Sequence, residues 1–405
     1  MPGRVSARLC PPNDLASRVD GTRVGEDRSE ILDRVPKAGR RLGDDRASGP
    51  EHEGGDQQVS YAYFYQAGGW NQNSRFDPVR AVTNDGRIEI DPYGKNTGDK
   101  AAAGGHSYCD KAPGSSFAAI PIVFVGRVLL QSLTRVEAES HAGITLLSYL
   151  ATILTCGLGT ALSALLIFRL AVKFGATPGG AAFAAIGFGL ATPAWCYATL
   201  FIGHAFVWTC LMFAFAAAVV LAGASNPRRD HLLGAAVGLF AAWAAITESP
   251  ATPAAAALAI VAIVQVWRDG SERRRRVAVG MLGASLPWVA LLLVYNRAAF
   301  GSPFQFGYSC EQLFTDMKEG FFGITYPKPH VLVDLLFERY RGLLPLAPVL
   351  TVAPIGLVML ARSPAARACA VGATVVAGYY ISPTAEVGHE LSRQGITRGP
   401  AASRP

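Results

Sequence analysis

The side chains most able to do chemistry are concentrated in a polar segment ahead of a series of long apolar runs. They are Asp99, Lys100, His106, Asp110 and Lys111. A carboxylate can accept the proton of an attacking hydroxyl, and a lysine ammonium can stabilise a departing phosphate group. This pattern fits group transfer from a phosphorylated donor. A solvated, turn-rich loop with incidental charge would have the same composition, so the pattern alone leaves both interpretations open.

The elements that must position these side chains are membrane-spanning helices. Half of the 405 residues are hydrophobic, only 17% are charged, and the mean hydropathy is +0.26. Roughly 20 apolar residues of helix cross a bilayer core about 30 Å thick. We therefore expect an all-α fold, a polytopic transmembrane helix bundle of about eight spans. The predicted spans are residues 144–168, 178–197, 204–222, 232–246, 250–267, 277–295, 342–360 and 366–381.

Four regions are predicted along the chain. They are a disordered polar tail at 1–60, an extracytoplasmic loop region at 61–143, the transmembrane bundle at 144–383 with an outer loop at 296–341, and a polar tail at 384–405. The first tail has too few large apolar groups to offset the entropy of ordering. In the loop region, residues 87–91 alternate like a strand. Residues 115–133 are apolar but interrupted by Pro121 and Arg127, which favours an interfacial helix.

Basic residues predict the orientation of the bundle. The formal net charge is +7, and much of the excess lies in short loops beside apolar runs, notably Arg273 to Arg276. Such loops normally face the cytoplasm and contact anionic lipid. The loop region at 61–114 and the loop at 296–341 then lie outside. No basic groove with interleaved aromatic residues is visible, so membrane lipids are expected partners and nucleic acid is not.

Seven cysteines are present without any Cys-x-x-Cys pair, which gives no support to a zinc or thioredoxin-type site. Cys109 and Cys310 lie in the two large polar loops and could form a disulfide if both loops share an oxidising compartment. No metal site and no cofactor are predicted, although a divalent metal stays open.

Two segments of the loop region resemble membrane glycosyltransferases of the GT-C superfamily, which include the protein O-mannosyltransferases and the lipid A aminoarabinose transferases. Residues 108–114, Tyr-Cys-Asp-Lys-Ala-Pro-Gly, look like their Tyr-x-Lys-Pro-Pro stretch ahead of an apolar helix. Residues 71–81 resemble the segment that carries their acidic pair, although this chain has Asn71 and Gln72 at the best alignment. The resemblance covers about residues 61–381 and includes the order of the interfacial helix, first long span and basic turn.

The resemblance implies transfer of a sugar from a polyprenyl-phosphate donor to an extracytoplasmic glycan, lipid or protein acceptor. It implies a site on the outer face of a bacterial inner (plasma) membrane. Neither amide at 71 and 72 can remove a proton, so the catalytic base would be Asp77, Asp99 or Asp110. Lys111, with a membrane-edge arginine, would stabilise the departing phosphate. Lys100 and His106 are further candidates for substrate binding in the same loop.

Other polar side chains near the predicted outer face each have a functional and a structural interpretation. The candidates for substrate contact are Arg127, His204, Glu248, Arg339 and Arg341. Arg127 could bind a lipid-linked phosphate or extend to the lipid headgroups. His204 could contact substrate or make a structural hydrogen bond. Glu248 could contact substrate or cap the following helix. The two later arginines could bind phosphate or anchor the membrane interface.

Two rival functions remain at this point. A transporter or flippase of lipid-linked sugars would need ionisable groups at mid-membrane, and the predicted spans have almost none. A catalytically inactive remnant of a glycosyltransferase is favoured by Asn71 and Gln72 and by both ends of the chain. The aromatic run at 61–65 looks like a membrane border without its helix, so we suspect an absent first span.

Overall fold

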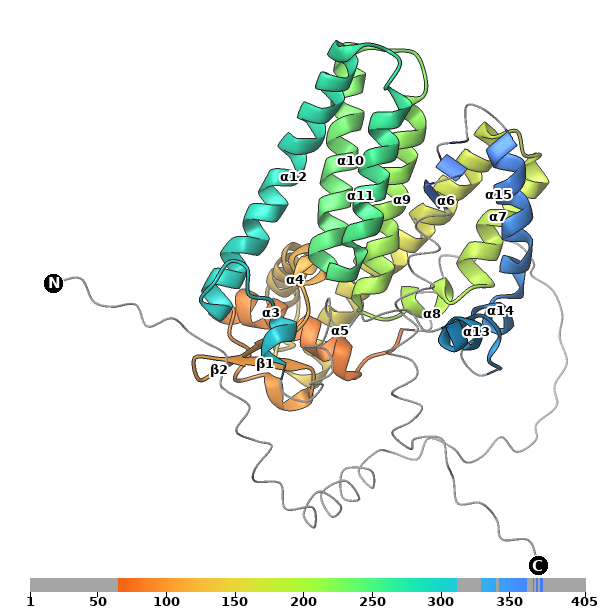
Figure 1. Ribbon diagram of the computed structural model, residues 1–405. Coiled ribbons are helices and arrows are strands. Elements are labelled where there is room, and N and C mark those ends of the chain that lie inside the picture. The colour runs from red at the N-terminus through yellow and green to blue at the C-terminus, as the bar shows by residue number, and fades with distance from the viewer. Residues whose placement is uncertain are drawn as a thin grey trace, which may run out of the picture.

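The computed structural model describes residues 65–311, 329–339 and 342–362, together with residues 367, 369, 370, 372 and 373. The predicted tails at 1–60 and 384–405, part of the outer loop and most of the last predicted span lie outside these residues. The described chain is all-α apart from one small hairpin, and its long helices lie side by side (Figure 1).

Four helices form the densest part of the bundle: α9 (Gly203–Leu221), α10 (Pro227–Thr247), α11 (Thr252–Gln265) and α12 (Ser271–Phe300). Asn226 begins α10 by accepting hydrogen bonds from two backbone amides of its first turn. Glycines bring α10 against α12, because a Cβ at Gly234 would lie 2.9 Å from the Cα of Val277, and one at Gly238 would overlap the backbone of Met281. Small residues at helix contacts are typical of packing in lipid.

A second group of helices begins at the other edge of this bundle. Helix α5 (His141–Thr152), the π-helical turn Ile153–Gly157 and α6 (Leu158–Lys173) form one continuous 33-residue helix. Helix α7 (Pro178–Leu190) and the short α8 (Ala194–Ala198) follow. The sequence predicted one span at 178–197. The structure ends the helix before Pro193, because proline lacks the amide needed inside a helix.

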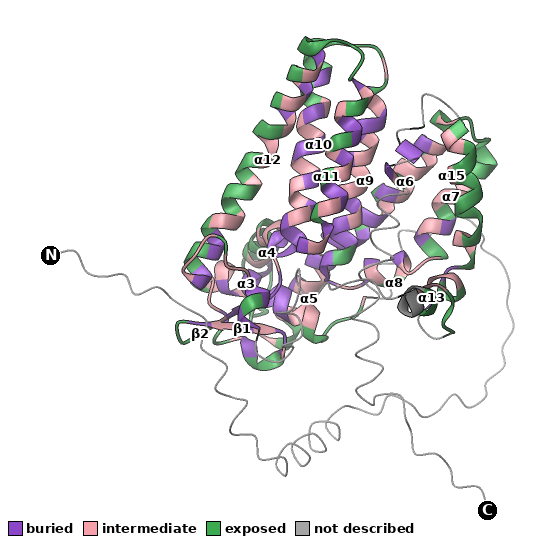
Figure 2. Ribbon diagram, in the orientation of Figure 1, coloured by how far each residue is buried: buried purple, intermediate pink, exposed green. Residues whose placement is uncertain are grey.

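Within the described residues, five helices are long and apolar enough to cross a membrane: Gly114–Leu133, His141–Lys173, Gly203–Leu221, Pro227–Thr247 and Ser271–Phe300. Their outer faces expose large apolar side chains, such as Leu282 and Leu286 on α12, where green marks exposed residues (Figure 2). Water would not favour such continuous apolar faces, whereas lipid does. The chain is therefore an α-helical membrane protein.

One end of the bundle is covered by a polar layer, which we call the cap and define as residues 65–140 and 301–311. It contains α3 (Trp70–Asp85), the 3-10 turn η2 (Gly94–Asn96), strands β1 (Lys100–Ala103) and β2 (His106–Cys109), α4 (Gly114–Leu133) and the 3-10 turn η5 (Gly307–Cys310). The strands form an antiparallel hairpin in which Lys100 pairs with Cys109 and Ala103 with His106. Figure 1 shows this layer at the lower end of the long helices.

Helix α4 lies along the polar helix α3. Near its beginning, the Ser116 hydroxyl donates to the Arg75 carbonyl at 2.7 Å, and near its end Arg127 donates to the Thr83 carbonyl at 2.9 Å. Both helices therefore run together in the same direction for about three turns. Although α4 has the length and composition of a span, this pairing with a polar partner fits an interfacial position.

Two local expectations are wrong, and one predicted span is interrupted. Residues 87–91 form no strand, because Ile90 makes only one backbone hydrogen bond to the hairpin, at Ser107. The hairpin itself lies at 100–109. The predicted span 342–360 is interrupted, with α14 (Leu343–Leu346), η7 (Pro348–Val352) and α15 (Ala353–Arg362) separated where prolines interrupt regular hydrogen bonding. Cys109 keeps a buried free thiol, so it forms no disulfide with Cys310.

Helix α13 (Pro329–Phe337) lies in the predicted outer loop.

Candidate functional site

Arg75 holds the cap onto the bundle. Its side chain is 1% exposed, and its guanidinium lies 2.5 Å from Glu248, at the C-terminal end of α10. Further hydrogen bonds run to Asn71 at 3.1 Å and to the Ser115 hydroxyl at 3.2 Å. Burial lowers the pKa of Arg75, but Glu248, Tyr308, Cys109 and Asp110 together outweigh burial and raise the pKa above its ordinary value. A buried, hydrogen-bonded ion pair of this kind fixes two elements in one geometry.

Lys111 lies between two carboxylates of the hairpin region. Its ammonium donates to Asp110 and lies 3.6 Å from Asp99, while the Tyr308 ring centroid is 5.3 Å away. Asp110 also accepts from the Ser74 hydroxyl at 3.0 Å. We call Arg75, Glu248, Asp99, Asp110 and Lys111 the anchor cluster.

The anchor cluster contains three carboxyls and two cations, and its pKa values follow from their contacts. Burial opposes the ionisation of Asp110, but Lys111, Glu311 and Ser74 outweigh burial, and the pKa of Asp110 lies below its ordinary value. For Lys111, burial lowers the pKa, but Asp110, Tyr308 and Asp99 together outweigh burial and raise the pKa. For Asp99, burial dominates and raises the pKa, with Lys111 acting against it. Asp110 is therefore ionised and fully engaged at neutral pH.

Glycines allow the anchor cluster to close. A Cβ at Gly203 would lie 2.9 Å from the guanidinium carbon of Arg75 and would overlap the Glu248 carboxylate. A Cβ at Gly114 would lie 2.7 Å from the Thr247 backbone nitrogen. The first turns of α4 and α9 thus approach the end of α10 more closely than any larger residue permits.

Asp77 lies one helical turn beyond Ser74 on α3 and has a different environment. It is 1% exposed, and its Oδ1 accepts from Asn96 at 3.2 Å and from Arg80 at 3.4 Å. Its Oδ2 is buried without a hydrogen-bond partner among the described residues. Burial raises the pKa of Asp77 to about 7, and Asn96 and Arg80 offset only part of that effect. This carboxyl can exchange a proton at neutral pH, as a general base must.

A polar network connects Asp77 to the end of α4. Arg80 donates to Glu139 at 2.5 Å, and Asn84 donates to the other oxygen of Glu139 at 2.5 Å. Arg127 in turn donates to the Asn84 side-chain oxygen. The Tyr93 ring stacks under Arg80, 4.3 Å from its guanidinium carbon. We call Asp77, Arg80, Asn84, Arg127 and Glu139 the open network, because buried atoms in it lack partners.

A cavity of about 350 Å³ adjoins the open network. Its polar lining is formed by Arg127, Gln131, Thr134, Arg135, Glu137 and Glu139. Glu139 therefore contacts the cavity and also pairs with Arg80, which contacts Asp77. The lining of this cavity includes none of the anchor-cluster residues.

The remaining predicted site residues occupy separate places. Lys100 donates to the Gly94 carbonyl at 3.0 Å, and His106 pairs with Asp91 at 2.7 Å on the exposed hairpin. Among the described residues, neither side chain forms a hydrogen bond or ion pair with the anchor cluster or the open network. His204 lies beside the anchor cluster, 3.5 Å from Glu248, with a half-exposed side chain.

Arg339 is exposed beyond α13, and Arg341 lies outside the described residues.

Several residues of these two groups were not predicted. Ser74, Arg75 and Arg80 lie in the segment 71–81 that carried the resemblance, and Ser74, Asp77 and Arg80 follow one another at three-residue spacing. That spacing places side chains on one face of a helix, a signal that the sequence contained. Glu139 gave no such signal, because its partner Arg80 is 59 residues away.

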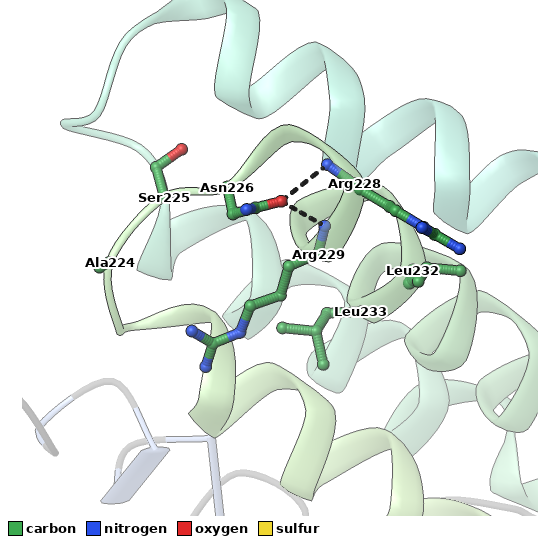
Figure 3. Close-up of a pocket in the computed structure, with 7 residues that line it drawn as sticks. All are labelled: Ala224, Ser225, Asn226, Arg228, Arg229, Leu232 and Leu233. Atoms are coloured by element: carbon green, nitrogen blue, oxygen red, sulfur yellow. Dashed lines mark hydrogen bonds between the residues drawn. The ribbon is translucent and has the colours of Figure 1, made fainter.

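A second cavity, about 660 Å³, lies at the opposite end of the bundle and includes Arg228, Arg229 and Leu232 in its lining. Figure 3 shows the Asn226 side chain accepting from the amides of both arginines, each at 3.1 Å. Nearby, the buried Arg273 donates to the carbonyls of Leu221 and Gly223.

The charged residues at this end of the bundle connect helix ends, and none of them is a predicted site residue.

Within the described part of the chain, no group of three or more His, Cys, Asp or Glu side chains is placed to hold a metal ion. No family model, curated protein or solved structure matches this chain.

Proposed function

We propose that this chain is a membrane glycosyltransferase that moves a sugar from a polyprenyl-phosphate donor to an acceptor on the extracytoplasmic side. The observation that carries the proposal is Asp77, a buried carboxyl with a pKa of about 7 and an unpartnered oxygen, which Arg80 and Glu139 connect to a cavity. Its segment, 71–81, and the Lys111 segment are the two that resemble the GT-C enzymes, and Ser74 joins them through Asp110.

The distribution of charge supports group transfer over transport. In α10 and α12 the charged side chains lie in the first two turns or the last turn, such as Asp230 and Arg297, and α9 and α11 have no Asp, Glu, Lys or Arg. A transporter would place ionisable groups near mid-membrane. Here the polar side chains gather in the cap, where a lipid-linked donor and a water-soluble acceptor can meet.

In the proposed reaction Asp77 is the general base. The acceptor hydroxyl gives its proton to the Asp77 carboxylate while its oxygen forms a bond to the anomeric carbon of the donor sugar. The bond from that carbon to the phosphate oxygen breaks, and the phosphate leaves with the electron pair. A proton acceptor whose pKa lies near the working pH is the most effective one.

The departing phosphate needs cations. Lys111 is the lysine of the motif at 108–114. Its contact with Asp99 at 3.6 Å is the weaker of its two ion pairs, so a phosphate can replace Asp99 there. His204 is half-exposed at the same outer helix ends and can donate to the same group. Asp99 and Asp110 then act as counter-ions, which leaves Asp77 as the base among the three candidates.

We infer an arrangement of eight spans in a bacterial inner membrane, with the cap outside. The count adds α7, α11 and the two segments 342–360 and 366–381 to the long helices and treats α4 as interfacial. Arg273 to Arg276 would then face the cytoplasm. Cysteine labelling of Ser271→Cys and Ser302→Cys, in a background without native exposed cysteine, should label these two positions from opposite sides. Labelling of both from one side contradicts the arrangement.

An inactive relative is the second candidate. Asn71 and Gln72 stand where the resembling enzymes have acids, and both have structural partners: Asn71 accepts from Arg75, and Gln72 accepts from the Gly69 amide at 2.7 Å. These amides fit a protein that has kept the fold of the cap and lost the acidic pair.

The test is a transfer assay with the full chain in lipid nanodiscs. A set of polyprenyl-phosphate hexoses and pentoses is supplied, with methyl glycosides and extracted envelope lipids as acceptors, and released polyprenyl phosphate is measured. We expect Asp77→Asn to lower turnover by about 10²–10⁴-fold. Asp85→Asn, on the same helix but exposed, should retain turnover. Equal turnover of both variants rejects Asp77 as base, and no turnover by the parent with any donor favours the inactive relative.

A further inference from the structure

The cavity at the end of α4 has the chemistry of a site for a neutral, polyhydroxylated ligand. Two of its lining side chains are cationic, Arg127 and Arg135, and two are anionic, Glu137 and Glu139. The formal charges cancel, so the cavity offers no net attraction to a phosphate or a carboxylate. It does offer hydrogen-bond donors and acceptors, which sugar hydroxyls need in equal measure.

Size and access agree with such a ligand. The volume of about 350 Å³ is at the lower end of the range of small-molecule sites, about 300–1,000 Å³. Gln131, Arg135 and Glu137 are exposed. The side chains of Arg135 and Glu137 make no hydrogen bond or ion pair with any described residue, so they are available to a ligand that enters from water.

The cavity is connected to the proposed base through two successive ion pairs, both made by Arg80. Glu139 contacts the cavity on one side and Arg80 on the other, and Arg80 lies 3.4 Å from Asp77 Oδ1. Arg80 Nε and Asp77 Oδ2 are both buried without a partner among the described residues. One is a donor and the other an acceptor, and a hydroxyl group can satisfy both because it donates and accepts. Leaving both unpartnered is costly.

We infer that this cavity binds a sugar ring of a glycan acceptor and directs one hydroxyl between Arg80 Nε and Asp77 Oδ2. The inference rests on the proposed function and narrows its acceptor from glycan, lipid or protein to carbohydrate. The ring occupies the charged cavity, where Arg135 and Glu137 bind its hydroxyls. The Arg80–Glu139 pair shifts to admit the reacting hydroxyl, whose proton passes to Asp77.

Binding is tested without a donor, by saturation-transfer difference NMR on the full chain in nanodiscs. The probes are methyl glycosides of hexoses and N-acetylhexosamines, with inorganic pyrophosphate as the anionic probe. We expect at least one glycoside to bind, and Arg135→Gln and Glu137→Gln each to weaken it about tenfold. Glu272→Gln is the control, because Glu272 is equally exposed but lies at the opposite end of the bundle, paired with Arg275.

The outcomes separate this inference from the proposed function. Failure of every glycoside to bind the parent, or equal binding by Arg135→Gln and the control, overturns the carbohydrate site. Pyrophosphate binding that requires Arg135 but does not compete with any glycoside also overturns the carbohydrate site, since the cavity would then be an anion site. Glycoside binding without turnover from any donor leaves the site intact and contradicts only the glycosyltransferase. Turnover onto lipid acceptors without glycoside binding contradicts the carbohydrate site and leaves the glycosyltransferase proposal intact.

Discussion

Asp110 and Asp77 are equally buried carboxyls in the same cap, each 1% exposed, but their partners differ. Asp110 has Lys111, Ser74 and Glu311 around it, and its pKa is lowered. Asp77 has Asn96 and a weaker contact to Arg80, and its pKa is about 7. Burial alone therefore does not decide what a carboxyl does.

The difference teaches which carboxyl can take part in chemistry. A fully partnered carboxylate is stabilised as an anion and is a weak base, whereas a desolvated one with an open oxygen binds a proton near neutral pH. On this view the open network supplies the base, whereas the anchor cluster fixes the cap and supplies Lys111 to the departing phosphate. Four experiments test this difference between the anchor cluster and the open network.

The largest expected effect on stability belongs to Asp110→Asn. This substitution leaves the buried Lys111 with Asp99 alone, and removing one partner of a buried ion pair typically costs about 3–5 kcal/mol. Denaturant unfolding in detergent should show a loss of that size. Asp85→Asn, an exposed carboxylate on α3, should change the free energy of unfolding by less than about 0.5 kcal/mol. A stable Asp110→Asn variant would mean that the anchor cluster does not hold the cap.

Gly203→Ala should cost about 1–3 kcal/mol, the usual penalty for overpacking a tight contact. Its Cβ would overlap the Glu248 carboxylate and press on Arg75, which pushes the main ion pair of the anchor cluster apart. Gly283→Ala on α12 is the matched control, because a Cβ there meets nothing within 4 Å, and it should be neutral or slightly stabilising. Equal unfolding midpoints for the two variants would contradict the close approach of α9 and α10.

The pH dependence of stability should report Asp77. Its folded pKa, about 7, lies above the unfolded value of about 3.9, so the folded state holds a proton that the unfolded state has released. Stability from this group is therefore present at low pH and is lost as pH rises through about 7. Between pH 6 and pH 8 the loss should be about 1.4 kcal/mol.

Asp77→Asn cannot ionise and should lack this pH-dependent loss. The difference in unfolding free energy between the variant and the parent, measured at pH 6, 7 and 8, checks it. A difference that stays constant with pH would place the pKa of Asp77 below this range.

The smallest effect should come from His106→Ala. The His106–Asp91 pair is exposed on the hairpin, and exposed ion pairs contribute about 0–1 kcal/mol. Thermal unfolding and transfer should both stay close to the parent. A large loss of transfer would place the hairpin in the substrate site and weaken the distinction between the two groups.

The sequence predicted the helical membrane fold because hydrophobicity and length are local properties. The runs that became α5–α6, α9, α10 and α12 can each be identified without knowing their neighbours. Their bounds were less accurate, since α12 extends through the arginine cluster to Phe300, where polar residues continue a helix beyond the apolar part. The strand at 87–91 failed because alternation specifies faces but not a pairing partner.

The candidate site was only partly predictable. The sequence by itself determined that acids and lysines gather in a polar layer beside apolar helices, and that Asp77, Asp99 and Asp110 were the carboxyls to compare.

The tertiary structure alone decided their differences, because each depends on residues far along the chain. Arg75 meets Glu248 across 173 residues, and Arg80 meets Glu139 across 59. The pKa of a carboxyl is set by its solvation and by the charges within a few ångströms, and those distances exist only once the helix ends have been brought together.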